Sequence, residues 1–209
     1  MEKIKISWAR RILKIVMWVF LFLVGLYVVA VIARVFYLLH KTKTDAETNM
    51  QVEKIHNTKL TLNDVMGKNL PPDPGALANQ TVAGVDANGN GIRDDVELAI
   101  FNAYPNSAKT RAVLLQYALL LQTEATSLIL NKETATTASE EYSRAYDCIG
   151  TIVPESNNDI QKIQAYIDFI DNLQLNTKER KDIKTNFDNQ TGSFELQRGC
   201  DIDLSTLPN

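Results

Sequence analysis

The stretch AVLLQYALLL, residues 112–121, contains a single strongly polar side chain, that of Gln116. A helix that is apolar on nearly all sides must be buried, so this run predicts the central helix of a folded domain. The helical pattern extends over residues 108–130, after Pro105, with Ser107 or Asn106 as its N-cap. It is too short and too interrupted to be a membrane span.

Four further helical patterns flank this segment, at residues 94–104, 134–149, 159–173 and from 176 onward. Their apolar residues recur at spacings of three and four, the period of one helix face. No alternation of period two is long enough for a sheet. The sequence therefore predicts an all-α domain with four or five helices. The apolar positions are Val96, Ile100, Phe101, Ala135, Ala138, Tyr142, Ala145, Ile149, Ile160, Ile163, Ile167, Ile170, Ile183 and Phe187.

Cys148 and Cys200 are the only cysteines of the chain. An even count in an exported domain predicts a disulfide, which here would stabilise the fold by about 4 kcal/mol on the chain-entropy model. A reactive thiol pair is the alternative, but the Cys-x-x-Cys spacing of redox motifs is absent.

Residues 15–33, IVMWVFLFLVGLYVVAVIA, carry no charge. As a helix this run rises about 28 Å, close to the roughly 30 Å of a bilayer's hydrocarbon core. It lacks the polar stripe of a core helix, and so predicts a transmembrane helix over residues 15–39. A cleaved signal peptide ending near residues 31–33 is the open alternative.

Basic residues on the two flanks predict the orientation of this helix. The more positive flank stays in the cytoplasm, so residues 1–14 form a cytoplasmic basic segment and the later residues lie in the periplasm or outside the cell. A juxtamembrane linker with a Pro-rich arm is expected over residues 40–85, and a helical domain over 86–209. The basic residues are Lys3, Lys5, Arg10, Arg11 and Lys14 before the run, and Arg34, Lys41 and Lys43 after it.

Charge is distributed unevenly along the chain. Residues 1–43 hold 8 basic residues and 1 acid, a net charge of +7, and residues 44–209 hold 14 basic residues and 24 acids, a net charge of −10. A nucleic-acid binder needs a basic face to neutralise phosphates, so the acidic part argues against that class.

Residues 86–97 read DANGNGIRDDVE and resemble the Asp-rich calcium loop of EF-hand proteins and of thrombospondin type 3 repeats. Calcium takes six to eight oxygen ligands, which alternate loop positions can supply. Gly91 stands where such loops turn sharply. The resemblance implies a Ca²⁺ site whose ligands are Asp86, Asn88, Asn90, the carbonyl of Ile92, Asp94 and Glu97.

This loop departs from the usual EF-hand in two respects. Ile92 stands at position seven with Arg93 at position eight, and the preceding segment is rich in Pro and Gly. These features favour a loop followed by one helix, with a dissociation constant of about 10⁻⁵–10⁻³ M. A plain turn is the alternative, because Asn-Gly pairs favour turns, but it leaves the acids at 86, 94 and 97 unexplained.

No catalytic constellation is expected. The two histidines, His40 and His56, flank the membrane run, so the rest of the chain has none for a triad or a zinc site. The carboxylate pairs Asp201/Asp203, Glu140/Glu141 and Asp168/Asp171 are typical of acidic surfaces. We therefore expect no enzyme activity and no catalytic residues.

Together these features predict a membrane-anchored calcium-binding protein with a structural or interaction role. Its expected partners are the lipid bilayer and a protein at the membrane or in the periplasm. A sensory or accessory module that responds to calcium or to a protein partner is the alternative. A carboxylate-dependent hydrolase is a third hypothesis.

Overall fold

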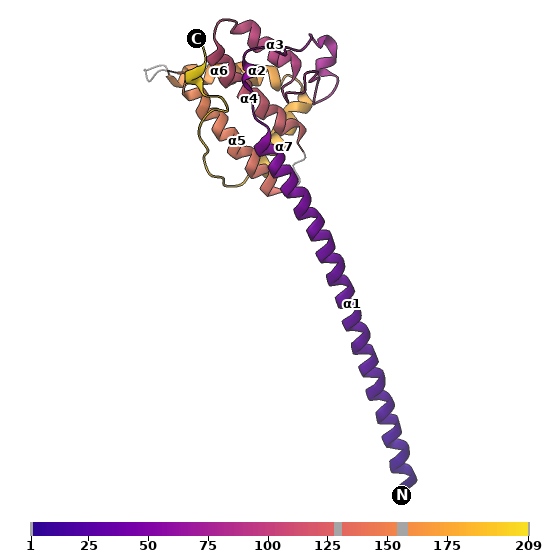
Figure 1. Cartoon of the computed structure of the whole chain (residues 1–209). Helices are drawn as coiled ribbons and strands as arrows, with labels where there is room; N and C mark the ends of the chain where they lie inside the picture. The colour runs from indigo at the N-terminus through magenta and orange to yellow at the C-terminus, as the bar shows by residue number, and fades with distance from the viewer. Residues whose placement is uncertain (1, 128–130, 154–158, 209) are drawn as a thin grey trace. The chain divides into compact units, whose positions relative to one another are not determined.

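The structure is a computed structural model that describes residues 2–127, 131–153 and 159–208 (Figure 1). Helices make up 71% of the chain, and the described residues form no strand. This confirms the predicted all-α class. The chain divides into two compact units, Met1–Glu47 and Thr48–Asn209.

Residues 2–47 of the first unit belong to helix α1 (Glu2–Asn57). By length and composition, α1 is able to cross a membrane. Its large apolar side chains from Leu13 to Leu39 are exposed. These apolar side chains surround the helix without a polar stripe between them, so no side of this part of the helix is better suited to water than another.

Helix α1 continues through residues 40–57, where the sequence suggested a linker. In the second unit Ile55 is buried with Ala135, Ala138 and Phe187. Thr48 is also buried, and its Oγ1 accepts a hydrogen bond from Asn131 Nδ2 at 2.7 Å. Between residues 40 and 57 only Thr48 and Ile55, which are seven residues apart, are buried. Two buried positions are too few to predict a helix from the sequence.

Helix α4 (Ala108–Thr126) packs against every other helix of the second unit from α2 to α7. Val113, Leu114 and Ala118 are fully buried, which confirms the predicted central helix as far as Thr126. Its expected continuation, 128–130, lies outside the described residues. The other elements are α2 (Leu62–Val65), η1 (Gly75–Asn79), α3 (Asp94–Ala103), α5 (Lys132–Gly150), α6 (Asp159–Gln174), α7 (Lys178–Gln190) and η2 (Leu204–Thr206).

Two details of the helices differ from the sequence pattern. The stripe expected on α6 is buried only at Ile167 and Ile170, whereas Ile160 is 83% exposed, because the first turn of α6 extends beyond the core. Helix α7 begins at Lys178, two residues later than expected, and is capped by Thr177, whose side chain accepts from the backbone N–H of Arg180.

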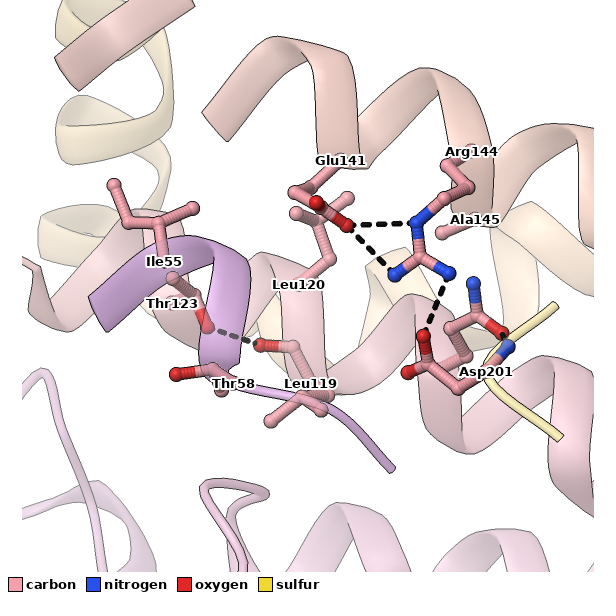
Figure 2. A pocket seen from close by; sticks show the side chains of 10 residues that line it. Ile55, Thr58, Leu119, Leu120, Thr123, Glu141, Arg144, Ala145 and Asp201 are labelled. Atoms are coloured by element: carbon pink, nitrogen blue, oxygen red, sulfur yellow. Dashed lines mark hydrogen bonds and ion pairs between the residues drawn. The ribbon is translucent and has the colours of Figure 1, made fainter. Parts of the chain in front are cut away.

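Cys148 on α5 and Cys200 in the C-terminal segment lie at disulfide distance, with their sulfur atoms 2.00 Å apart. This is the predicted pairing. Next to it, Arg144 forms ion pairs of 2.6 Å with both Glu141 and Asp201 (Figure 2). Leu60 N donates to Asp201 Oδ2 at 2.9 Å, so the segment after α1 is held against α5 and the C-terminal segment.

Candidate metal site

The loop 86–97 is fixed at its base by backbone and core contacts. Asp94 N donates to the carbonyl of Val85 at 2.8 Å, and the side chain of Ile92 is fully buried in the core. Arg93 is also fully buried, and its guanidinium binds Asp95 through two hydrogen bonds of 2.6 and 2.9 Å. The same guanidinium donates to the carbonyl of Leu173 at the end of α6.

The first half of the loop turns around the carboxylate of Asp86. Its two oxygens accept from the backbone N–H groups of Asn90 at 3.1 Å and of Gly91 at 2.9 Å. Gly91 has a φ of +83°, and a Cβ there would lie 2.8 Å from Leu119 Cδ1. A side chain at position 91 is therefore excluded both by the backbone conformation and by space. Asn90 Oδ1 accepts from Ile92 N at 2.9 Å.

Glu97, in the first turn of α3, is 1% exposed. Its Oε2 accepts from Asn88 Nδ2 at 3.0 Å, while Asn90 Nδ2 is buried with no hydrogen-bond partner. Burial raises the pKa of Glu97 to about 7, and the negative charges of Asp64 and Asp94 act in the same direction. The amides of Asn88 and Asn90 lower this pKa, but less than burial raises it.

Asp94 also belongs to the predicted ligand set, but its carboxylate faces the loop backbone. It accepts from Ala87 N at 3.0 and 3.2 Å, and burial raises its pKa. Within the described residues, no three His, Cys, Asp or Glu side chains converge closely enough to hold a metal ion. The structure thus brings Asn88, Asn90 and Glu97 together, while Asp86 and Asp94 accept hydrogen bonds from backbone N–H groups.

Asp64 on α2 is a neighbour of this loop that the sequence analysis did not identify. It lines the same cleft of about 460 Å³ as Asp86, Asn88 and Asn90. Thr61 binds its Oδ2 through both its backbone N–H and its hydroxyl, forming a capping box. The Thr-x-x-Asp pattern was readable from sequence as a helix start, but its nearness to a loop more than 20 residues later was not.

The Pro-rich arm before the loop is held by Arg180 of α7. This guanidinium is buried and donates to the carbonyls of Ala78, Thr81 and Val82 at 2.7 to 3.0 Å. It also donates to Asn79 Oδ1 at 2.7 Å. The arm is therefore packed on the helical unit through an arginine that no sequence motif indicated.

One member of each carboxylate pair considered as catalytic has a partner elsewhere in the structure. Glu141 and Asp201 lie on either side of Arg144, and Asp171 accepts from the hydroxyl of Tyr117 at 3.1 Å. Comparison with models of protein families, with curated proteins and with solved structures finds no match for this chain. The interpretation of the site rests on its own geometry.

Proposed function

We propose that this chain is a membrane-anchored extracytoplasmic protein whose helical unit binds one calcium ion at residues 86–97, with a structural or interaction role. The observation that best supports the proposal is the environment of the Glu97 carboxylate. Its carboxylate is buried beside Asn88 and Asn90, and its pKa is raised to about 7. A divalent cation beside this group would stabilise its ionised form.

The donor set suits calcium in its chemistry. Asp86, Asp94 and Glu97 supply carboxylate oxygens, and each amide of Asn88 and Asn90 carries an oxygen as well as a nitrogen. The buried Asn90 Nδ2 lacks a hydrogen-bond partner in the present arrangement. Turning the Asn90 amide by half a rotation would bring its oxygen to the same place, where it could bind a cation in exchange for the hydrogen bond from Ile92 N.

The role we propose for the ion is structural. The loop joins the Pro-rich arm to the start of α3. The cleft beside the loop is also lined by Asn57 at the end of α1 and by Thr58, Lys59 and Thr61 after it. A cation at the loop would reduce repulsion among Asp64, Asp94 and Glu97. We expect it to stabilise this end of the helical unit and to present one rigid surface to a protein partner.

The membrane part of the proposal rests on α1 and its flanks. The apolar run of α1 is long enough to span a bilayer, and the basic residues before it favour a cytoplasmic N-terminus. The acidic helical unit with its cysteine pair would then lie in the oxidising compartment, where disulfides persist.

A sensory or accessory module is the second candidate function. It is favoured by the position of the loop, because the cleft is shared between the loop and the residues that directly follow α1. Calcium binding there would act on the end of α1, the same helix that carries the apolar run. The two candidates differ in whether calcium changes stability alone or also changes partner binding.

The test is a calcium titration of the full chain in detergent micelles by calorimetry, with thermal melts in calcium and in chelator. We expect one site with a dissociation constant of about 10⁻⁵–10⁻³ M and a higher melting temperature in calcium. Asp86→Ala should abolish both effects. The exposed Glu53, on α1 within the same unit, provides the matched control Glu53→Ala, which should leave both unchanged.

The outcomes separate the alternatives. Absence of binding up to about 10 mM calcium, beyond the weak extracellular range, overturns the calcium proposal. Binding that leaves the melting temperature unchanged, but alters cross-linking to a membrane partner, favours the sensory candidate over the structural one. Equal losses in Asp86→Ala and Glu53→Ala would show that the effect does not arise at the loop.

A further inference from the structure

A second cavity, of about 330 Å³, lies between α4, α5, α7 and the segment that follows α7. It is independent of the loop 86–97. One wall is aromatic and the other carries charged groups of both signs. Its lining comprises Glu124, Ser139, Tyr142, Lys184, Phe187, Asp188, Thr191 and Phe194.

Glu124 is the most unusual group in this cavity. Its side chain is 2% exposed, and both carboxylate oxygens are buried without a hydrogen-bond partner. Lys184 Nζ lies 3.4 Å from Oε2, as an ion pair without hydrogen-bond geometry. Burying a carboxylate costs free energy unless hydrogen bonds and an opposite charge compensate. Glu124 has a nearby opposite charge but, within the described part of the chain, lacks the hydrogen bonds.

Lys184 has a better partner than Glu124. Its ammonium donates to Asp188 Oδ1 at 2.5 Å, on the same helix. It also lies 5.3 Å from the ring centroids of both Tyr142 and Phe187, a distance at which aromatic faces attract a cation. The cavity wall therefore already accommodates one ammonium group. That group does not donate a hydrogen bond to the Glu124 carboxylate.

The balance of charge around the cavity is negative. The negative charges of Asp188 and Asp171 both act on Glu124, and Lys184 is the cation that opposes them. Asp171 is held by the hydroxyl of Tyr117, which in turn lies 3.4 Å from that of Tyr142. Once Glu124 is ionised, three acidic groups stand against one basic group, which favours a cationic ligand over an anion.

We propose that this cavity is a binding site for a small organic ammonium ion. The charged nitrogen would donate to the carboxylate of Glu124, whose oxygens accept no hydrogen bond from the residues that the structure describes. The apolar part of the ligand would lie against Tyr142, Phe187 and Phe194. A volume of about 330 Å³ is far larger than a metal ion needs and matches a molecule of several heavy atoms.

Binding of such a ligand is coupled to a proton. Burial raises the pKa of Glu124 to about 8, with Asp188 and Asp171 adding to the shift and Lys184 opposing it. At pH 7 the unliganded carboxyl therefore carries a proton in about nine molecules of ten. An ammonium ligand requires the ionised form, so it displaces this proton as it binds.

The probe for this site is n-butylammonium, which reproduces the charged end of a lysine side chain. The full chain in detergent micelles is titrated by calorimetry at pH 7, in two buffers of different ionisation enthalpy, with chelator present. We expect one site, half-saturated near about 1 mM for a ligand of this size, with release of about 0.9 proton. n-Butanol and butyrate test the same shape without the positive charge and should bind at least tenfold more weakly.

Variants identify the group responsible. Glu124→Gln keeps the size of the side chain and should weaken butylammonium binding at least tenfold, with proton release lost. Glu179→Gln, at an exposed position on α7, is the control and should bind as the parent does. Phe194→Ala, at the partly exposed mouth of the cavity, should weaken binding several-fold and serves if Glu124→Gln does not fold.

Three results would overturn the proposal. These are saturable binding of butyrate in preference to butylammonium, undiminished butylammonium binding by a folded Glu124→Gln chain, and no butylammonium binding up to about 50 mM, well above the affinity expected of so small a ligand. None of these outcomes bears on calcium at residues 86–97, because the titration is run in chelator.

Discussion

Single buried arginines hold the irregular segments of this protein in place. Arg93 and Arg180 have side chains buried near the Pro-rich arm, and Arg111 is buried beneath the ring of Phe101. Arg111 donates to the carbonyls of Tyr104 and Pro105 in the turn between α3 and α4. Backbone carbonyls in loops need partners when they are buried, and a guanidinium supplies five donors in a fixed plane.

Arg180→Met tests this role at one position. The apolar side chain keeps much of the volume but leaves the carbonyls of Ala78, Thr81 and Val82 without a donor. We expect a loss of about 3 kcal/mol in the free energy of unfolding, measured by urea denaturation. Lys181→Met, at the adjacent exposed position, is the control and should change stability by less than about 0.5 kcal/mol. Similar losses in both variants would contradict the assignment.

The carboxyl of Glu124 predicts how stability depends on pH. Its folded-state pKa of about 8 lies above the ordinary value of 4.5, so the folded chain holds a proton that the unfolded chain releases between these limits. Stability from this group is full below about pH 4.5 and is lost as the pH rises through about 8. Asp171, whose pKa is also raised, acts with the same sign, and Lys184 remains charged throughout this range.

Glu124→Gln should therefore flatten the fall in unfolding free energy between pH 5 and pH 8. The measurement is a series of denaturation curves in chelator, in which the Glu124→Gln variant is compared with the parent chain at each pH. The same pH slope in Glu124→Gln as in the parent chain would contradict the prediction.

Among the helices, α5 is the element that joins the most distant parts of the sequence. Its N-cap, Asn131, binds Thr48 of α1, and its last turns bind the C-terminal segment through Cys148 and Ser143. Between these ends, Glu141 accepts from Lys59 Nζ at 2.7 Å. One helix thus connects the segment after α1 with the end of the chain.

Removal of the disulfide tests this connection. The two cysteines are 52 residues apart, so a Cys148→Ser, Cys200→Ser chain should lose about 4 kcal/mol of stability on the chain-entropy model. Denaturant midpoints of the parent with and without reductant should reproduce the difference. The double variant should be insensitive to reductant. An unchanged midpoint in the double variant would mean that the C-terminal segment is held without the disulfide.

The whole molecule combines an apolar helical unit with a compact acidic one. The charge of the first 43 residues is +7 and that of the remainder is −10, an asymmetry that supports the proposed cytoplasmic N-terminus. The compact unit buries a core around α4, and the described large apolar side chains of the first unit remain exposed. Such exposure is consistent with burial in lipid.

Cysteine labelling tests the proposed orientation. The chain offers positions for single cysteines on either side of the apolar run, at Lys3→Cys and at the exposed Glu53→Cys, with the native cysteines held in their disulfide. A membrane-impermeant maleimide applied to intact cells should label Glu53→Cys at least tenfold more than Lys3→Cys. After detergent lysis both should react. The reverse pattern in intact cells would place the helical unit in the cytoplasm.

Local patterns in the sequence determined much of this protein. The unbroken apolar run, the central position of α4, the caps at Ser107 and the pairing of the only two cysteines follow from composition, period and count. These features depend on neighbours three or four residues away, or on a single possible partner. The calcium loop was also identified locally, by the spacing of its acids and amides, and its function stays a prediction.

Tertiary structure alone decided the features that join distant residues. The helix over residues 40–57 buries few side chains, so its pattern is faint, and its packing comes from Ala138 and Phe187 far along the chain. Asp64 lies beside the loop, and Glu124 faces a cavity with Lys184, through folding and not through spacing. A sequence shows which groups carry charge. Only the packed chain decides which of those groups lose water and which partner each one meets.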